Sequence, residues 1–221
     1  MVNLNSRPEW SKSILTDEQI QRLSKTVSSV ESHTEGEILT VLVSRSSHVG
    51  HVPWVLFGFL MTSAFLIERT LMAWTWSLWP TSVYLVLFVV LFALSRFLSK
   101  FSWVQRALTS NEDEIKQVNI RAELEFLQGH ARNTIGQTGI LLFVSLMEHR
   151  AVVLADEGIA KHFPPETWDE VVGLLTSEFK SGQYFEGFEK AILKCGDILK
   201  SKLPAEKDNL NQISNHLIIK D

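Results

Sequence analysis

The acidic turn at residues 156–158 carries the side chains best suited to chemistry. Asp156 and Glu157 stand directly before Gly158, at the end of an apolar run. Carboxylate oxygens are the ligands that a hard cation such as Ca²⁺ prefers, but Ca²⁺ takes six to eight of them, and no EF-hand spacing gathers that many here. Asp156 therefore has two interpretations, as a cation ligand or as a residue that caps the turn through Gly158.

Phosphate chemistry is a second possibility, because His149 and Arg150 precede this turn in the sequence. Phosphoryl transfer needs a nucleophile or a metal-bound water, together with groups that stabilise the phosphate charge. The sequence has no glycine-rich phosphate loop, no paired-metal His/Asp cluster and no nucleophile elbow. Ser145 is expected inside a strand, and Cys195 lies on an apolar helix face, which is typical of a core residue rather than a reactive thiol. The motifs indicate catalysis only weakly.

A covered sheet is the element that must position the acidic turn. Two apolar runs within residues 138–159 flank Glu148-His149-Arg150, which predicts a hairpin of buried strands. Residues 37–44 predict another buried strand of the same sheet. A capping box of Thr16 and Gln19 opens an amphipathic helix. Further helices are expected to begin at Asn111, at Pro164-Pro165 and at Tyr184, and the tail is expected to return as an extended segment at residues 217–219.

Residues 53–98 have a different character, because long stretches within them carry no charge. Residues 54–67 and 81–95 are uncharged, and a tryptophan-rich segment at 73–80 separates them. A helix needs about twenty predominantly apolar residues to cross a bilayer, and indole rings favour the headgroup layer. The pattern predicts a transmembrane helical hairpin. The alternative, two core helices of a soluble bundle, would normally show a polar stripe.

Charges next to the predicted spans set the expected orientation. The tryptophan-rich loop has no basic residue beyond Arg69, and Glu68 and Arg69 lie near the end of the first span, where they can reach the interface. Basic residues gather instead on the side of the two termini, at Arg45, Arg96, Lys100 and Arg106. The positive-inside rule therefore places both termini in the cytoplasm.

The overall composition excludes some classes of function. A net charge of −4 argues against nucleic-acid binding, which needs a basic face to neutralise phosphates. A single cysteine allows no intrachain disulfide. The first thirty residues lack the apolar core of a signal peptide.

The run at residues 138–146, followed by Glu148, Arg150 and Leu154-Ala155-Asp156-Glu157-Gly158-Ile159, resembles the TPM-domain family. The resemblance is specific to a branch of uncharacterised bacterial inner-membrane proteins, and it covers nearly the whole chain outside the first residues. In that branch two membrane helices are inserted between the first strand and the second helix of the domain. The resemblance implies an α/β fold, a small sheet sandwiched by helices and interrupted by a two-helix transmembrane hairpin.

Members of this family are described as acid phosphatases, as calcium binders or as auxiliary and assembly factors of membrane complexes. The candidate metal ligands are Asp156 and Glu157 on the acidic turn, with Asp208 in the tail; no cofactor is expected as certain, and Ca²⁺ is the ion that the resemblance suggests. The chain departs from the branch at Lys202-Leu203-Pro204, which stands where His-Phe-Pro is usual. Gln212 stands where the branch has an acidic residue, which weakens a cation site there.

The expected organisation is a lead-in at 1–12, a first part of the α/β domain at 13–50, the hairpin at 53–98, a second part at 103–204 and a tail at 205–221. The expected function is that of an accessory, scaffold or assembly factor of a membrane complex. Its expected partners are the lipid bilayer and a membrane protein or a second copy of the chain. The alternative is a metal-dependent acid phosphatase-like hydrolase.

Overall fold

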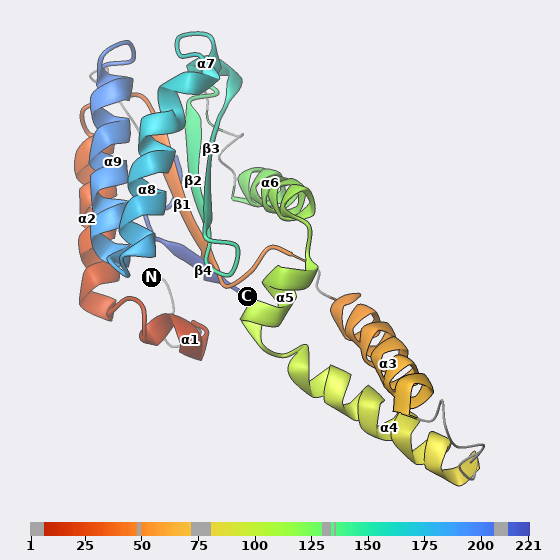
Figure 1. Ribbon diagram of the computed structural model, residues 1–221. Helices are drawn as coiled ribbons and strands as arrows, with labels where there is room; N and C mark the ends of the chain where they lie inside the picture. Colours follow the sequence, from red (N-terminus) through yellow and green to blue (C-terminus); the bar gives the residue numbers. More distant parts are fainter. Residues whose placement is uncertain (1–6, 48–49, 72–80, 130–133, 135, 206–211) are drawn as a thin grey trace. The chain divides into compact units, whose positions relative to one another are not determined.

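The computed structural model describes residues 7–47, 50–71, 81–129, 134, 136–205 and 212–221 of the 221 (Figure 1). The chain divides into two compact units. One comprises residues 1–46 together with 115–221, and the other comprises residues 47–114. Each unit is described by itself.

A four-stranded sheet forms the centre of the first unit, with strand order β3-β2-β1-β4. The strands are β1 (Glu37–Val43), β2 (Gly139–Ser145), β3 (Arg150–Ala155) and β4 (Ile218–Lys220). β1 runs parallel to β2 and to β4, and β2 and β3 form the antiparallel hairpin. The expectation that residues 37–44 join the sheet of this hairpin is confirmed. The tail does return as an extended segment, and it forms β4 beside β1. β1 and β2 are buried along their whole length, which explains why they are continuous apolar runs in the sequence.

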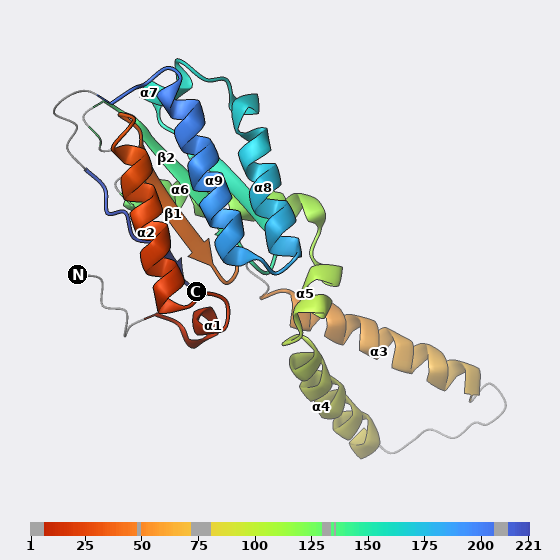
Figure 2. The same ribbon diagram turned by 90° about the vertical axis from the view of Figure 1, so that its left-hand side faces the viewer.

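Helices cover both faces of the sheet (Figures 1 and 2). Successive strand residues point to opposite faces, so Ile38 and Leu42 join one apolar cluster, and Leu39 and Val41 join the other. The first cluster lies under α2 (Asp17–Glu31), α8 (Asp169–Lys180) and α9 (Tyr184–Lys200), and the second lies under α6 (Asn111–Gln128). The predicted α/β fold with a sheet flanked by helices is therefore confirmed.

Local signals fix the ends of several helices. Thr16 and Gln19 form the reciprocal hydrogen bonds of a capping box at the start of α2. Gly182 ends α8 with φ of 76°, a conformation that favours glycine. The helix expected at Pro164-Pro165 begins as a 3₁₀ turn, η3 (Pro165–Trp168), and becomes α-helical only from Asp169. Two further helices are a single turn each, α1 (Glu9–Lys12) and α7 (Glu157–Ala160).

The second unit contains α3 (Val52–Leu71), α4 (Thr81–Leu98) and α5 (Ser102–Leu108). α3 and α4 contact each other through aromatic side chains, because Phe57 packs edge-on against Phe88 and Phe92. Their other faces carry large exposed apolar side chains. One helix in the described part of the chain, at Val52–Thr70, is long and apolar enough to cross a membrane, and α4 is an apolar helix somewhat below that length. The tryptophan-rich segment at 73–80 lies outside the described residues.

Candidate functional site

The acidic turn at Asp156 begins α7. Asp156 is the N-cap, its Oδ1 accepts a hydrogen bond from Glu157 N at 2.9 Å, and the residue is only 4% exposed. Gly158 N donates to Gln137 O at 2.9 Å. A Cβ at Gly158 would lie 2.3 Å from Gly136 O and 2.6 Å from Gln137 O, so this close approach requires glycine. Asp156 therefore caps this turn, which is one of the two roles that the sequence suggested for it.

The fit of this turn to a cation can be judged from its oxygens. Asp156 Oδ2 is buried and has no hydrogen-bond partner, so one carboxylate oxygen is available. Glu157 is exposed, and Asp208 lies outside the described residues. Across the described ranges, no three His, Cys, Asp or Glu side chains gather as a metal-binding group. The described residues do not supply the six to eight oxygens of a Ca²⁺ site, and the metal role of Asp156, Glu157 and Asp208 stays a prediction.

The other polar residues of the hairpin lie far from Asp156. His149 directly precedes β3, Arg150 begins it and Asp156 follows its end, roughly 20 Å from Arg150 along the strand. Glu148 precedes them at the same end of the hairpin. The fold therefore does not bring together the His149, Arg150 and Asp156 set that a phosphatase could have used.

Glu148 is a buried carboxylate that binds the chain at Ser46, three residues after the end of β1. Its two oxygens lie 3.1 and 3.2 Å from Ser46 N, and it also accepts a hydrogen bond from the Ser145 hydroxyl. The Ser46 hydroxyl donates to Ser145 Oγ at 2.8 Å. Ser46 is the last residue of the first unit before the chain enters residues 47–114. Glu148 therefore fixes the point at which the chain leaves the sheet.

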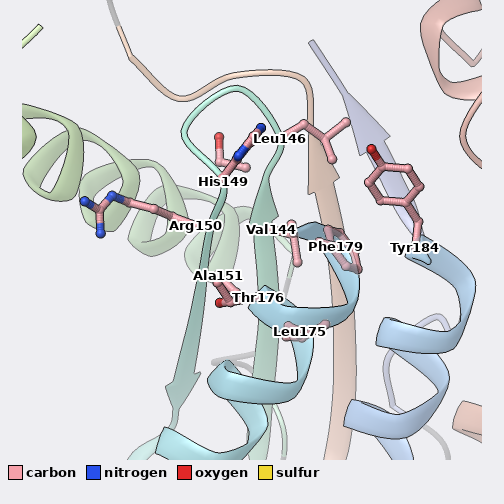
Figure 3. A pocket seen from close by; sticks show the side chains of 10 residues that line it. Val144, Leu146, His149, Arg150, Ala151, Leu175, Thr176, Phe179 and Tyr184 are labelled. Carbon is pink, nitrogen blue, oxygen red and sulfur yellow. The ribbon is translucent and has the colours of Figure 1, made fainter. Parts of the chain in front are cut away.

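A small pocket of about 50 Å³ lies beside the turn that joins β2 to β3, between the hairpin and the facing ends of α8 and α9 (Figure 3). Val144, Leu175 and Phe179 line its apolar part, and His149 takes a positive φ of 52° at its rim. The Arg150 side chain extends away from these apolar residues (Figure 3). This volume holds one or two water molecules and is too small for a phosphate ester.

Glu31 and Glu37 form a buried acidic pair that the sequence analysis did not single out. Glu31 Oε1 accepts from Ile38 N at 2.8 Å, and Glu37 Oε2 accepts from Ile213 N at 3.1 Å and Gln212 N at 3.2 Å. Burial raises the pKa of Glu31 to about 8, and the nearby Glu37 charge adds to this rise. Burial also raises the pKa of Glu37, although its two backbone hydrogen bonds oppose the shift.

This pair has a structural role at the edge of the sheet. β4 pairs only with the second half of β1, from Val41 onward. Along the first half, Glu31 accepts the hydrogen bond of Ile38 N, and Glu37 holds residues 212 and 213 beside the strand through their backbone N–H groups.

Cys195 is fully buried, as the sequence predicted, and burial raises the pKa of its thiol.

Residues 107–198 match the family model of the TPM domain. A TPM domain is therefore present in this chain, and its family is of uncertain function. The matched segment runs from the end of α5 into α9, so it contains β2 and β3. It leaves out β1 and β4, which complete the same sheet.

A solved structure supports the same fold. The chain is similar to the NMR structure of the BA42 protein from the psychrophilic bacterium Bizionia argentinensis, with a TM-score of 0.58 and 18% identity. The similarity covers 93% of this chain and 94% of that protein, and at this identity it concerns the fold alone. No curated protein matches the chain. The TPM-like α/β fold expected from residues 138–159 is confirmed.

Proposed function

We propose that this chain is a membrane-anchored TPM-domain protein of the bacterial inner-membrane branch, in which α3 and α4 cross the bilayer and the α/β unit binds a partner. The observation that carries the proposal is the pairing of β1 with β2. These strands flank the segment that contains α3 and α4, yet they pair in parallel over seven residues, from Glu37 with Gly139 to Val43 with Ser145. A chain that leaves one side of a membrane must therefore return to that side before β2.

This condition favours two spans over one. α3 has 20 residues and is about 30 Å long, which matches the hydrocarbon thickness of a bilayer. α4 has 18 residues and is about 27 Å long, enough to cross with modest bilayer thinning. If α3 crosses the membrane, α4 must cross back. Both termini then lie on one side, and the flanking basic residues favour the cytoplasm.

The surfaces of the two helices suit lipid rather than water. Phe59 on α3 is 68% exposed and Leu85 on α4 is 64% exposed, and neither helix has a polar stripe. Tyr84 donates a hydrogen bond to Glu68 Oε1 at 2.5 Å, which links α3 to α4 and satisfies a carboxylate near the end of the span. Glu68 therefore has a structural role in the proposed hairpin.

The side chains that could do chemistry in the α/β unit have structural roles instead. Asp156 caps α7, Glu148 binds Ser46, and Cys195 lies in the core. This favours an accessory, scaffold or assembly role over a hydrolase. Tethering would raise the concentration of the domain near membrane partners, either a membrane protein or a second copy of the chain.

Cross-linking in native membranes, followed by detergent purification, tests this role. We expect a stoichiometric membrane-protein partner or a dimer, and a lone monomer would contradict the proposal. A phosphatase assay with and without Ca²⁺ or Mg²⁺ tests the alternative, with Asp156→Asn and the exposed control Asp169→Asn. Metal-dependent turnover that Asp156→Asn abolishes and Asp169→Asn retains would establish the hydrolase instead.

A further inference from the structure

A second pocket, of about 460 Å³, lies within the 47–114 unit, between α5 and the first turn of α6. It is shallow and broadly open to solvent. Its lining residues are Trp103, Ala107, Thr109, Asn111 and Glu114. Neither the similarity to the TPM domain nor the proposed role of the α/β unit gives this pocket a function.

Glu114 gives this pocket a negative wall. The residue is only 6% exposed, and its carboxylate makes no hydrogen bond or ion pair within the described part of the chain. It lies in the first turn of α6, where the helix dipole stabilises a negative charge. A carboxylate that faces a pocket next to apolar and aromatic groups can attract a cationic group.

The remaining walls suit an ammonium ion. Trp103 is 69% exposed, so its indole face can attract a cation. Thr109 Oγ1 donates to Gln105 O at 2.8 Å, which leaves the lone pairs of its hydroxyl oxygen able to accept a hydrogen bond. An ammonium group with N–H donors therefore finds a carboxylate, an aromatic face and a neutral acceptor in one place.

The position of the pocket in the chain identifies the source of that ammonium. α5 begins at Ser102, shortly after α4 ends at Leu98, and two exposed aromatic rings mark this junction, Phe97 in the last turn of α4 and Phe101 directly before α5. Aromatic rings next to an apolar helix are typical of the headgroup layer. We propose that this pocket binds the primary ammonium of an ethanolamine-type lipid headgroup, an inference that rests on the proposed membrane anchor. Glu114 would repel anionic headgroups, and a choline headgroup has no N–H to donate.

Native mass spectrometry of the full-length protein in detergent tests this assignment. Phosphatidylethanolamine, phosphatidylcholine and phosphatidylglycerol with identical acyl chains are added separately. We expect phosphatidylethanolamine to be retained roughly tenfold more than phosphatidylglycerol, because its ammonium can form one charge-assisted hydrogen bond with Glu114 that phosphatidylglycerol cannot form. Equal retention of the three lipids would overturn the proposal.

Glu114→Gln keeps the shape of the side chain and removes its charge, so it should abolish the preference. Glu112→Gln, an exposed residue of the same turn, is the matched control and should keep it. Equal loss in both variants would indicate a general charge effect and contradict the site. Displacement by free ethanolamine at the same concentration would contradict the lipid source.

Alkaline carbonate extraction of the same variants separates this inference from the membrane anchor. We expect Glu114→Gln to remain in the membrane fraction while losing its lipid preference. Wild-type protein that retains no lipid preference but resists extraction would contradict only the pocket. Extraction of the wild type would contradict the anchor itself.

Discussion

Replacing Glu31 by glutamine should make the fold less sensitive to alkaline pH. Glu31 is buried between the end of α2 and the first half of β1, with Glu37 nearby. Its pKa rises from 4.5 to about 8, chiefly because burial disfavours the charged carboxylate. Glutamine keeps an oxygen that can accept from Ile38 N and carries no charge, so it imitates the protonated acid.

The sign and size of the effect follow from linkage. Below pH 4.5 the carboxyl is protonated in both the folded and the unfolded chain, and the stabilising effect of its raised pKa is fully present. Between pH 4.5 and about 8 the unfolded chain loses the proton while the folded chain keeps it, so the free energy of unfolding falls as pH rises. At 1.36 kcal/mol per pH unit the full loss is about 5 kcal/mol, an upper bound because the site can relax.

Urea unfolding of the full chain in mild detergent, followed by circular dichroism between pH 5 and 8.5, measures this dependence. We expect Glu31→Gln to match the wild type near pH 5 and to be several kcal/mol more stable at pH 8.5. Glu18→Gln, on the exposed face of the same helix, should follow the wild type at every pH. A difference between wild type and Glu31→Gln that does not change with pH would refute the reasoning.

Other substitutions test the remaining contacts. Gly158→Ala should lower the free energy of unfolding by about 1–3 kcal/mol, because the added Cβ meets two backbone oxygens. Gly173→Ala is the control, since nothing lies within 4 Å of its Cβ, and it should raise the free energy of unfolding by up to about 1 kcal/mol. Thermal unfolding in which both variants shift in the same direction would contradict this. Glu148→Ala should cost about 1–3 kcal/mol and speed hydrogen exchange at the Ser46 amide, and unchanged exchange there would contradict the assigned hydrogen bonds. Cys195 should react with thiol reagents only after unfolding, and rapid labelling of the native protein would show that it is not in the core.

The sequence predicted those parts of the fold that depend on local pattern. Continuous apolar runs located β1 and the β2–β3 hairpin, and the capping box located the start of α2. The one-turn helix α7 could not be seen, because a single turn has too few residues to show a helical period. The 3₁₀ start before α8 was missed for the same reason.

The buried carboxylates could not be predicted because their partners are distant in the sequence. Glu148 binds the backbone of Ser46, and Glu37 binds the backbone of Ile213. A glutamate beside a strand is typical of a solvated position, and only the folded chain brings the backbone N–H donors to it. Glu114 is similar, since its burial depends on how α5 lies against the start of α6.

Cysteine labelling of the full chain in right-side-out vesicles tests the two-span anchor most directly. The native Cys195 is buried and serves as an unreactive background. Lys12→Cys and Lys202→Cys, both exposed in the first unit, should react with a membrane-impermeant maleimide only after the vesicles are opened, whereas Ser77→Cys should react at once. Labelling of Lys12→Cys and Lys202→Cys from opposite sides would contradict the account, and so would labelling of all three positions from the same side.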